Sequence, residues 1–159
     1  MKNTMRLFCA IIFYVHAMYA QEKEQSSQLI QVAQSYMQFV HDVGSARSVQ
    51  LDDRRVATLF AKNLTKIDNR TTLFANDRQL LLPQMKGFEK EDNPQATEAA
   101  WTIDIDHALI VPSVETNSVV VHFEWKHVHV GNATTMAILQ LNENGQIKSI
   151  IDVWAKVQK

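Results

Sequence analysis

Three apolar runs joined by short turns near the C-terminus constrain the fold of this chain most. The first run, Val119–Val130, is rich in β-branched and aromatic residues, which favour half-buried strands. Gly131-Asn132 separates it from the run Thr135–Leu141, and Asn144-Gly145 separates that from Ile147–Ala155. An Asn-Gly pair between apolar runs is a strong signal for a β-hairpin. The pattern predicts an antiparallel meander, which we expect to be strongly bent, with helices across one face.

Length and charge restrict the class of protein. A chain of 159 residues favours one domain, and its 46% hydrophobic and 21% charged residues are typical of a globular protein that buries a core. The net charge of −1 lacks the basic excess that a non-specific nucleic-acid surface needs. We therefore expect no nucleic acid as a partner, and no electrostatic attachment to a membrane surface.

The N-terminus has the pattern of a secretory signal peptide. Lys2 and Arg6 precede the apolar stretch Leu7–Ala20, and the polar run Gln21–Ser27 follows. A basic start, a short apolar stretch and a small residue before a polar break are typical of such peptides. The stretch is shorter than the roughly 20 apolar residues that span a bilayer. Residues 1–20 are therefore predicted to direct export.

Residues 21–159 are then the mature domain, exported to a periplasm or secreted, with no stable membrane insertion after cleavage. Ala20 directly precedes the polar break, whereas Val15-His-Ala17 fits the small-residue rule better, so the cleavage point stays open. An uncleaved N-terminal anchor is the alternative. The only cysteine, Cys9, lies inside this segment, so the mature domain has no disulfide and no thiolate metal site.

Helices are predicted before the meander. Apolar residues at positions 29, 33, 36 and 40 recur with helical spacing, Ser26 or Ser27 can cap the start of that helix, and Gly44 suits its end. A short second helix over about residues 52–60, a hairpin over residues 63–74 and a third helix over residues 77–88 follow. Trp101–Leu109 then alternates apolar and polar residues, as a half-buried strand does, and residues 112–117 form the next turn.

This order of elements resembles the SnoaL-like branch of the nuclear transport factor 2-like (NTF2-like) superfamily. The resemblance covers about Gln28 to Val157 and rests on Leu59-Phe60 before Asn63, on Thr71–Phe74 with the helix after it, on Val119–Val130, and on Asn144–Ile147 before a closing strand that carries Asp152. It implies an α+β cone, in which N-terminal helices pack on a strongly curved mixed or antiparallel β-sheet around an apolar pocket. The superfamily includes isomerases, dehydratases, polyketide cyclases, epoxide hydrolases and many non-catalytic binding domains.

Alternation along Val119–Val130 separates two sets of side chains. The set that we expect to face the pocket begins with bulky apolar residues and comprises Val121, Phe123, Trp125, His127 and His129. The other set contains His122, Glu124 and Lys126, which suit solvent or a subunit contact. Alternation does not orient the closing strand, because both of its sides are largely apolar. The resemblance helps there, because limonene-epoxide-hydrolase-like members carry an acidic residue at about the place of Asp152.

Those members also carry an Arg-x-Asp pair on the preceding long strand, where this chain has Trp125 and His127, and this difference argues against epoxide hydrolysis. What remains is a candidate catalytic pair, His127 and Asp152, since an imidazole held by a carboxylate is a sound general base. The candidate ligand-binding residues around it are Tyr36, Trp125, His129 and Phe123. Ligand contact without chemistry is one alternative, and a purely structural pair or an exposed Asp152 is another.

Metal and cofactor sites have little support in the sequence. His127 and His129 lie two apart on one face of a strand, and Asp152 or His107 could complete three zinc ligands, yet no further ligand motif accompanies them. Gly-x-Ser-x-Gly, phosphate-loop and dinucleotide motifs are absent from the sequence. We predict no metal and no cofactor.

The sequence thus predicts an exported domain that binds a small apolar or amphipathic molecule in its cup. An enzymatic alternative is a SnoaL-like lyase, isomerase or hydrolase that transfers protons through His127 and Asp152. A third interpretation is a non-catalytic interaction module, a homodimer formed through the outer face of the sheet with His122, Glu124 and Lys126 at the contact.

Overall fold

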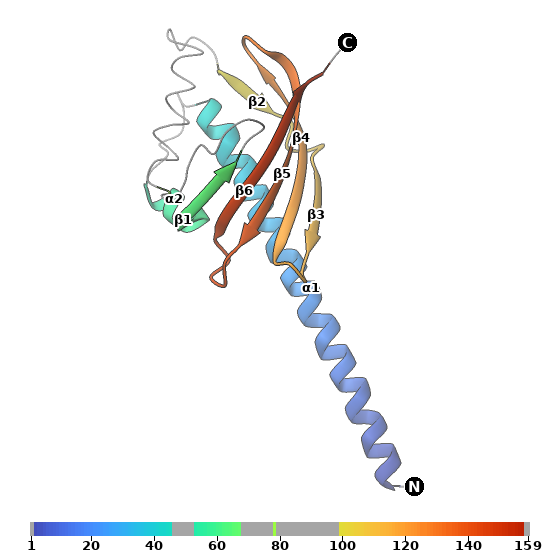
Figure 1. The fold of residues 1–159 in the computed structure, drawn as a ribbon. Coiled ribbons are helices and arrows are strands. Elements are labelled where there is room, and N and C mark those ends of the chain that lie inside the picture. The colour runs from blue at the N-terminus through green and yellow to red at the C-terminus, as the bar shows by residue number, and fades with distance from the viewer. Residues whose placement is uncertain (1, 46–52, 68–77, 79–98, 158–159) are drawn as a thin grey trace.

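A computed structural model describes residues 2–45, 53–67, 78 and 99–157. A strongly curved sheet wraps over the C-terminal half of a long helix, whose N-terminal half extends away from the sheet (Figure 1). The elements in chain order are the helices α1 (Lys2–Gly44) and α2 (Asp53–Leu59), followed by the strands β1 (Phe60–Ile67), β2 (Trp101–Ile103), β3 (Leu109–Ser113), β4 (Ser118–His127), β5 (Gly131–Leu141) and β6 (Ile147–Lys156).

The predicted meander forms the centre of the sheet. β4, β5 and β6 are consecutive antiparallel neighbours, and Gly145 adopts a positive φ of 74° in the turn between β5 and β6. β1 adds to the outer side of β6 in parallel, while β2 and β3 both pair with the free side of β4. The sheet is therefore mixed, and the predicted α+β class is confirmed.

The concave face of the sheet carries the buried apolar side chains, and α1 covers it. Val119, Val121 and Phe123 of β4 are buried there, as the alternation predicted, together with inward-facing residues of β5 and β6. α1 contributes the predicted stripe, of which Leu29, Ala33 and Tyr36 are buried and Val40 is half-buried. Burial of this shared surface is what holds helix and sheet together.

The start of the first helix was predicted wrongly. α1 does not begin at Ser26 or Ser27 but at Lys2, and it runs through the predicted signal segment before ending at Gly44 as expected. Residues 2–43 contain neither glycine nor proline, so nothing in the sequence stops a helix there. In the described part of the chain, no helix is both long and apolar enough to cross a membrane.

The strand predicted over Trp101–Leu109 is broken in two. β2 ends at Ile103 and β3 begins at Leu109, so that Trp101 pairs with His127 and Leu109 pairs with His122. Asp104 accounts for the break, because its side chain accepts a 3.2 Å hydrogen bond from the backbone N–H of His107. Such local side-chain bonds stabilise turns in competition with strand pairing.

Other boundaries shift by a few residues. Phe60 starts β1 instead of ending the second helix, and the long strand predicted to reach Val130 ends at His127. Pro112 lies inside β3, a strand at the edge of the sheet, where a missing N–H is tolerated. The predicted strand over residues 71–74 lies outside the described residues, as does the third helix over residues 77–88 apart from position 78.

The end of α1 touches β2 so closely that Gly44 leaves no room for a side chain. A Cβ atom at this position would lie 2.6 Å from the backbone oxygen of Trp101 and 2.5 Å from its ring. We expect Gly44→Ala to lower the free energy of unfolding by about 1–3 kcal/mol, because the helix must move away from β2. Urea unfolding measures the change. Ser35→Ala, at an exposed position of the same helix, is the control and should stay within about 0.5 kcal/mol.

Candidate functional site

Asp152 is the most unusual residue on the concave face. It is a carboxylate that is only 7% exposed, and it shares a cross-strand row with Ala137 of β5 and Val121 of β4. Lys66 of β1 lies diagonally beside it, opposite Ile150, and its Nζ is 2.8 Å from Oδ2 of Asp152. Both side chains of this ion pair are at least 86% buried. A positive charge at this distance offsets much of the cost of removing the carboxylate from water.

The second oxygen of the same carboxylate has no partner. Oδ1 of Asp152 is buried and accepts no hydrogen bond from any residue that the structure describes. A buried acceptor left unpaired costs about 1–3 kcal/mol, and more when the group is charged. Buried unpaired polar atoms are rare in folded proteins and call for a specific explanation, such as a bound molecule or a catalytic role.

Tyr36 reaches the same region from α1. It is 4% exposed, and burial raises the pKa of its phenol far above the ordinary value, while the negative charge of Asp152 raises that pKa further. The phenol therefore stays protonated at all physiological pH values. Tyr36 brings a neutral hydroxyl, able to donate a hydrogen bond, close to the unpaired carboxylate.

His127 lies at the far end of β4, opposite Gly131. Its Nδ1 accepts hydrogen bonds from the backbone N–H groups of His129, at 3.2 Å, and Val130, at 3.4 Å. Because Nδ1 is the acceptor, the proton of the neutral ring belongs on Nε2. The ring also stacks on Trp101, with 6.1 Å between the ring centroids. These bonds fix the imidazole to the turn that follows β4.

The predicted acid/base pair of His127 and Asp152 does not form. Asp152 lies in the row of Val121, and His127 is six residues further along β4, which is about 20 Å at the rise of an extended strand. Asp152 pairs with Lys66 instead. Alternation had placed His127 on the inner face correctly, and the family resemblance had indicated Asp152, but neither says which rows of the sheet the two residues occupy.

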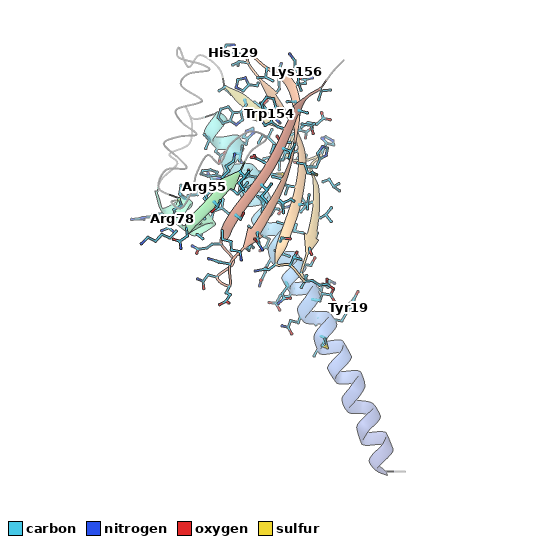
Figure 2. All side chains as sticks on the ribbon, viewed as in Figure 1. Tyr19, Arg55, Arg78, His129, Trp154 and Lys156 are labelled. Atoms are coloured by element: carbon cyan, nitrogen blue, oxygen red, sulfur yellow. The ribbon has the colours of Figure 1, made fainter. Side chains whose placement is uncertain are left out.

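An aromatic cluster extends along the concave face from the row next to Asp152 to His127 and the turn after it. It consists of Trp101, Trp125, Trp154, His127 and His129 and includes every tryptophan of the chain. Trp125 contacts Trp154 and His127 at centroid distances of 5.8 Å each, and its Nε1 donates a 3.0 Å hydrogen bond to Oγ1 of Thr135. Trp154 lies on the inner face of β6, and Figure 2 shows it with His129 at the end of the sheet away from the N-terminus.

The sequence predicted most of these positions. Tyr36, Phe123, Trp125 and Asp152 all lie on the concave side, as expected, whereas His129 is exposed in the turn because β4 ends two residues earlier. Lys66 was missed, although it follows the buried Leu64 by two positions and so belongs to the same face of its strand. Within the described ranges, no three His, Cys, Asp or Glu side chains gather as metal ligands.

Comparison with solved structures identifies the fold. A putative isomerase of the SnoaL-like family from Agrobacterium tumefaciens str. C58 matches with a TM-score of 0.54 at 14% identity, over 81% of this chain and 98% of that one. An epoxide hydrolase/cyclase-like enzyme of pyran ring formation in the polyether salinomycin matches with a TM-score of 0.55 at 14% identity, over 82% and 94%. An NTF2-like protein of unknown function from Cytophaga hutchinsonii gives 0.50 at 15% identity, over 82% and 99%.

The chain has the NTF2-like cone fold. The resemblance seen in the sequence is thus confirmed at the level of architecture, down to the mixed sheet curved around an N-terminal helix. No family model and no curated protein matches the sequence itself. What this NTF2-like chain does has to be argued from its own concave face.

The ion pair gives a direct test of how the site is held. We expect Lys66→Met to lower the free energy of unfolding by about 3–5 kcal/mol, because the buried carboxylate of Asp152 loses its counter-charge. Adding Asp152→Leu should recover most of that loss, since an apolar pair needs no charge compensation. Lys62→Met, at an exposed position of the same strand, is the matched control for urea unfolding and should change little. A Lys66→Met variant as stable as the wild type would contradict the pairing.

Proposed function

We propose that this NTF2-like domain binds a small amphipathic molecule against its concave face. The observation that carries the proposal is the buried Oδ1 of Asp152, a charged acceptor without a donor in the part of the chain that the structure describes. A polar group of the ligand bonds to this atom, and the apolar body of the ligand lies along the neighbouring aromatic rings.

The chemistry of the surroundings supports this arrangement. Small-molecule sites are usually apolar with a few polar groups that fix orientation. Here Asp152, Lys66 and Tyr36 are those polar groups. Phe123 and Trp154 supply apolar surface in the adjacent inward row, and Trp125 does so in the row after it. Since Trp125 already donates its ring N–H to Thr135, it offers its flat carbon surface to a ligand.

Proton transfer is the second candidate function, in the form of a SnoaL-like lyase, isomerase or hydrolase. A carboxylate acceptor and a protonated phenol close together, Asp152 and Tyr36, can remove a proton from a bound molecule and stabilise the charge that develops elsewhere on it. Such chemistry does not involve His127, which is held at the other end of the aromatic cluster.

Export remains part of the proposal. It is supported by the basic start and the short apolar stretch of residues 1–20, and it would place the binding domain in a periplasm or outside the cell.

A substitution that fills the interior tests the binding function. Ala137 lies beside Asp152 in the same row and is fully buried, so Ala137→Leu adds volume where the ligand is placed. We expect native mass spectrometry to detect a small molecule that co-purifies with the wild-type protein from its source, and to detect at least about tenfold less with Ala137→Leu.

Ile138→Leu, at the next residue on the opposite face, is the matched control and should retain the molecule. Circular dichroism confirms that each variant is folded. Wild-type protein that carries no small molecule, or equal loading of both variants, contradicts the proposal.

The outer face of the sheet supports the homodimer that the sequence predicted. Its central rows expose an outer apolar patch, which consists of Leu109, Val111, Met136, Ile138, Ile151 and Val153. His122, Glu124 and Lys126 are also exposed on this face, as predicted. An apolar patch that spans several strands favours association with another protein surface. We propose that two copies of the chain associate through this face.

A charge in the centre of the outer apolar patch should disrupt such a dimer. We expect the wild-type protein to sediment as a dimer and Ile138→Glu to sediment as a monomer, because the association would bury the new carboxylate. Gln34→Glu adds the same charge on the exposed side of α1 and should leave the dimer intact. A monomeric wild type would rule out this assembly.

A further inference from the structure

We propose that the site at Asp152 selects a neutral alcohol, and that Lys66 is the positioning residue that makes it do so. This inference rests on the proposed binding function and goes further, because it names the chemical class of the ligand and a residue that controls selectivity. It follows from three properties of the buried groups: the unpaired acceptor of Asp152, its charge balance with Lys66, and the protonated phenol of Tyr36.

The hydrogen-bond capacity of the site excludes ligands without a donor. An ionised carboxylate can only accept hydrogen bonds, so the unpaired Oδ1 of Asp152 requires an O–H or N–H group. A ketone, ether or ester would place a second acceptor oxygen against the first and leave Oδ1 unpaired. The penalty for that unmade bond falls on every such ligand, whatever its apolar body.

The charge of the site then separates neutral donors from cationic ones. Among the described residues, the charge of Asp152 is balanced by Lys66, whose Nζ lies 2.8 Å from Oδ2. An ammonium group at Oδ1 would bring a second positive charge to one carboxylate inside the protein, where an uncompensated charge is costly. A carboxylic acid ligand would bring a second negative charge with the same result.

Tyr36 makes a hydroxyl the best neutral donor. Burial and the nearby Asp152 raise the pKa of Tyr36, so its phenol keeps its proton and can donate it to a ligand oxygen. An alcohol oxygen can accept that bond while its own proton is donated to Oδ1 of Asp152. In the proposed arrangement a single hydroxyl group lies between the two residues and bonds to both, as no ketone or ammonium can.

The test compares three probes of one shape: 2-adamantanol, 2-adamantanone and protonated 2-aminoadamantane. Cyclohexanol, cyclohexanone and protonated cyclohexylamine form a second, smaller series. Binding to the full chain is followed by tryptophan fluorescence and by calorimetry. We expect the alcohol to bind the wild-type protein about tenfold more tightly than the ketone or the ammonium probe. Asp152→Asn should bring the alcohol and ketone affinities together, because the amide can donate to a ketone oxygen.

Lys66 variants test the source of the selectivity. Lys66→Met removes the counter-charge of the carboxylate, which the ammonium probe can replace, so this probe should overtake the alcohol. Lys66→Arg keeps the counter-charge and should keep the alcohol preference. Lys62→Met, exposed on the same strand, should behave as the wild type. A purely structural lysine would weaken all three probes equally and would not reverse their order.

Each outcome supports or contradicts either this inference or the proposed binding function. If the ketone or the ammonium probe binds the wild type as tightly as the alcohol, this inference is wrong while the binding function stands. If no probe of either series binds, both are contradicted. If Lys66→Met does not fold, the wild-type, Asp152→Asn and Lys66→Arg affinities still decide, since an unchanged alcohol preference in Asp152→Asn would overturn the proposal.

Discussion

The packing of α1 against the concave face of the sheet is the contact on which the rest of the structure depends. The concave side of the curved sheet carries the buried apolar side chains of the strands, and that side needs a cover. The end of α1 is fixed against β2 by Nε1 of Trp101, which donates to the backbone oxygen of Val40 at 2.9 Å, and by the N–H of Ala100, which donates to Gly44 at 2.9 Å. The absence of a side chain at Gly44 permits this approach. Helix and sheet therefore meet in one defined arrangement.

This packing buries two carboxylates, which differ in how many of their oxygens have a partner. Asp42 of α1 accepts hydrogen bonds from Gln38 on one oxygen and from Arg55 of α2 on the other. Asp152 has Lys66 on one oxygen and, within the described residues, nothing on the other. Asp42, with both oxygens paired, has a structural role, because it links α1 to α2. A carboxylate with one oxygen unpaired can still accept a hydrogen bond, and this contrast within one chain supports the proposed site.

Two of the errors in the sequence predictions have related causes. Alternation along β4 assigned Phe123, Trp125 and His127 to the inner face correctly, because the period of a strand is fixed by its backbone. It failed to separate Asp152 from His127, because a period says which face a residue takes and not which row. The break after Ile103 was missed for a similar reason, since the side chain of Asp104 bonds to the backbone of His107 while keeping the alternating pattern intact.

The sequence by itself determined the meander, its glycine turns and the apolar stripe of α1, because these depend on local periodicity and turn chemistry. The NTF2-like cone was expected from the resemblance of this order of elements to that superfamily. The sequence also determined which side chains of β4 face inward. Only the tertiary structure decided which polar groups meet. The parallel pairing of β1 with β6 joins residues more than 80 positions apart, and it places Lys66 rather than His127 beside Asp152. A partner chosen by strand register across that distance leaves no local signal in the sequence.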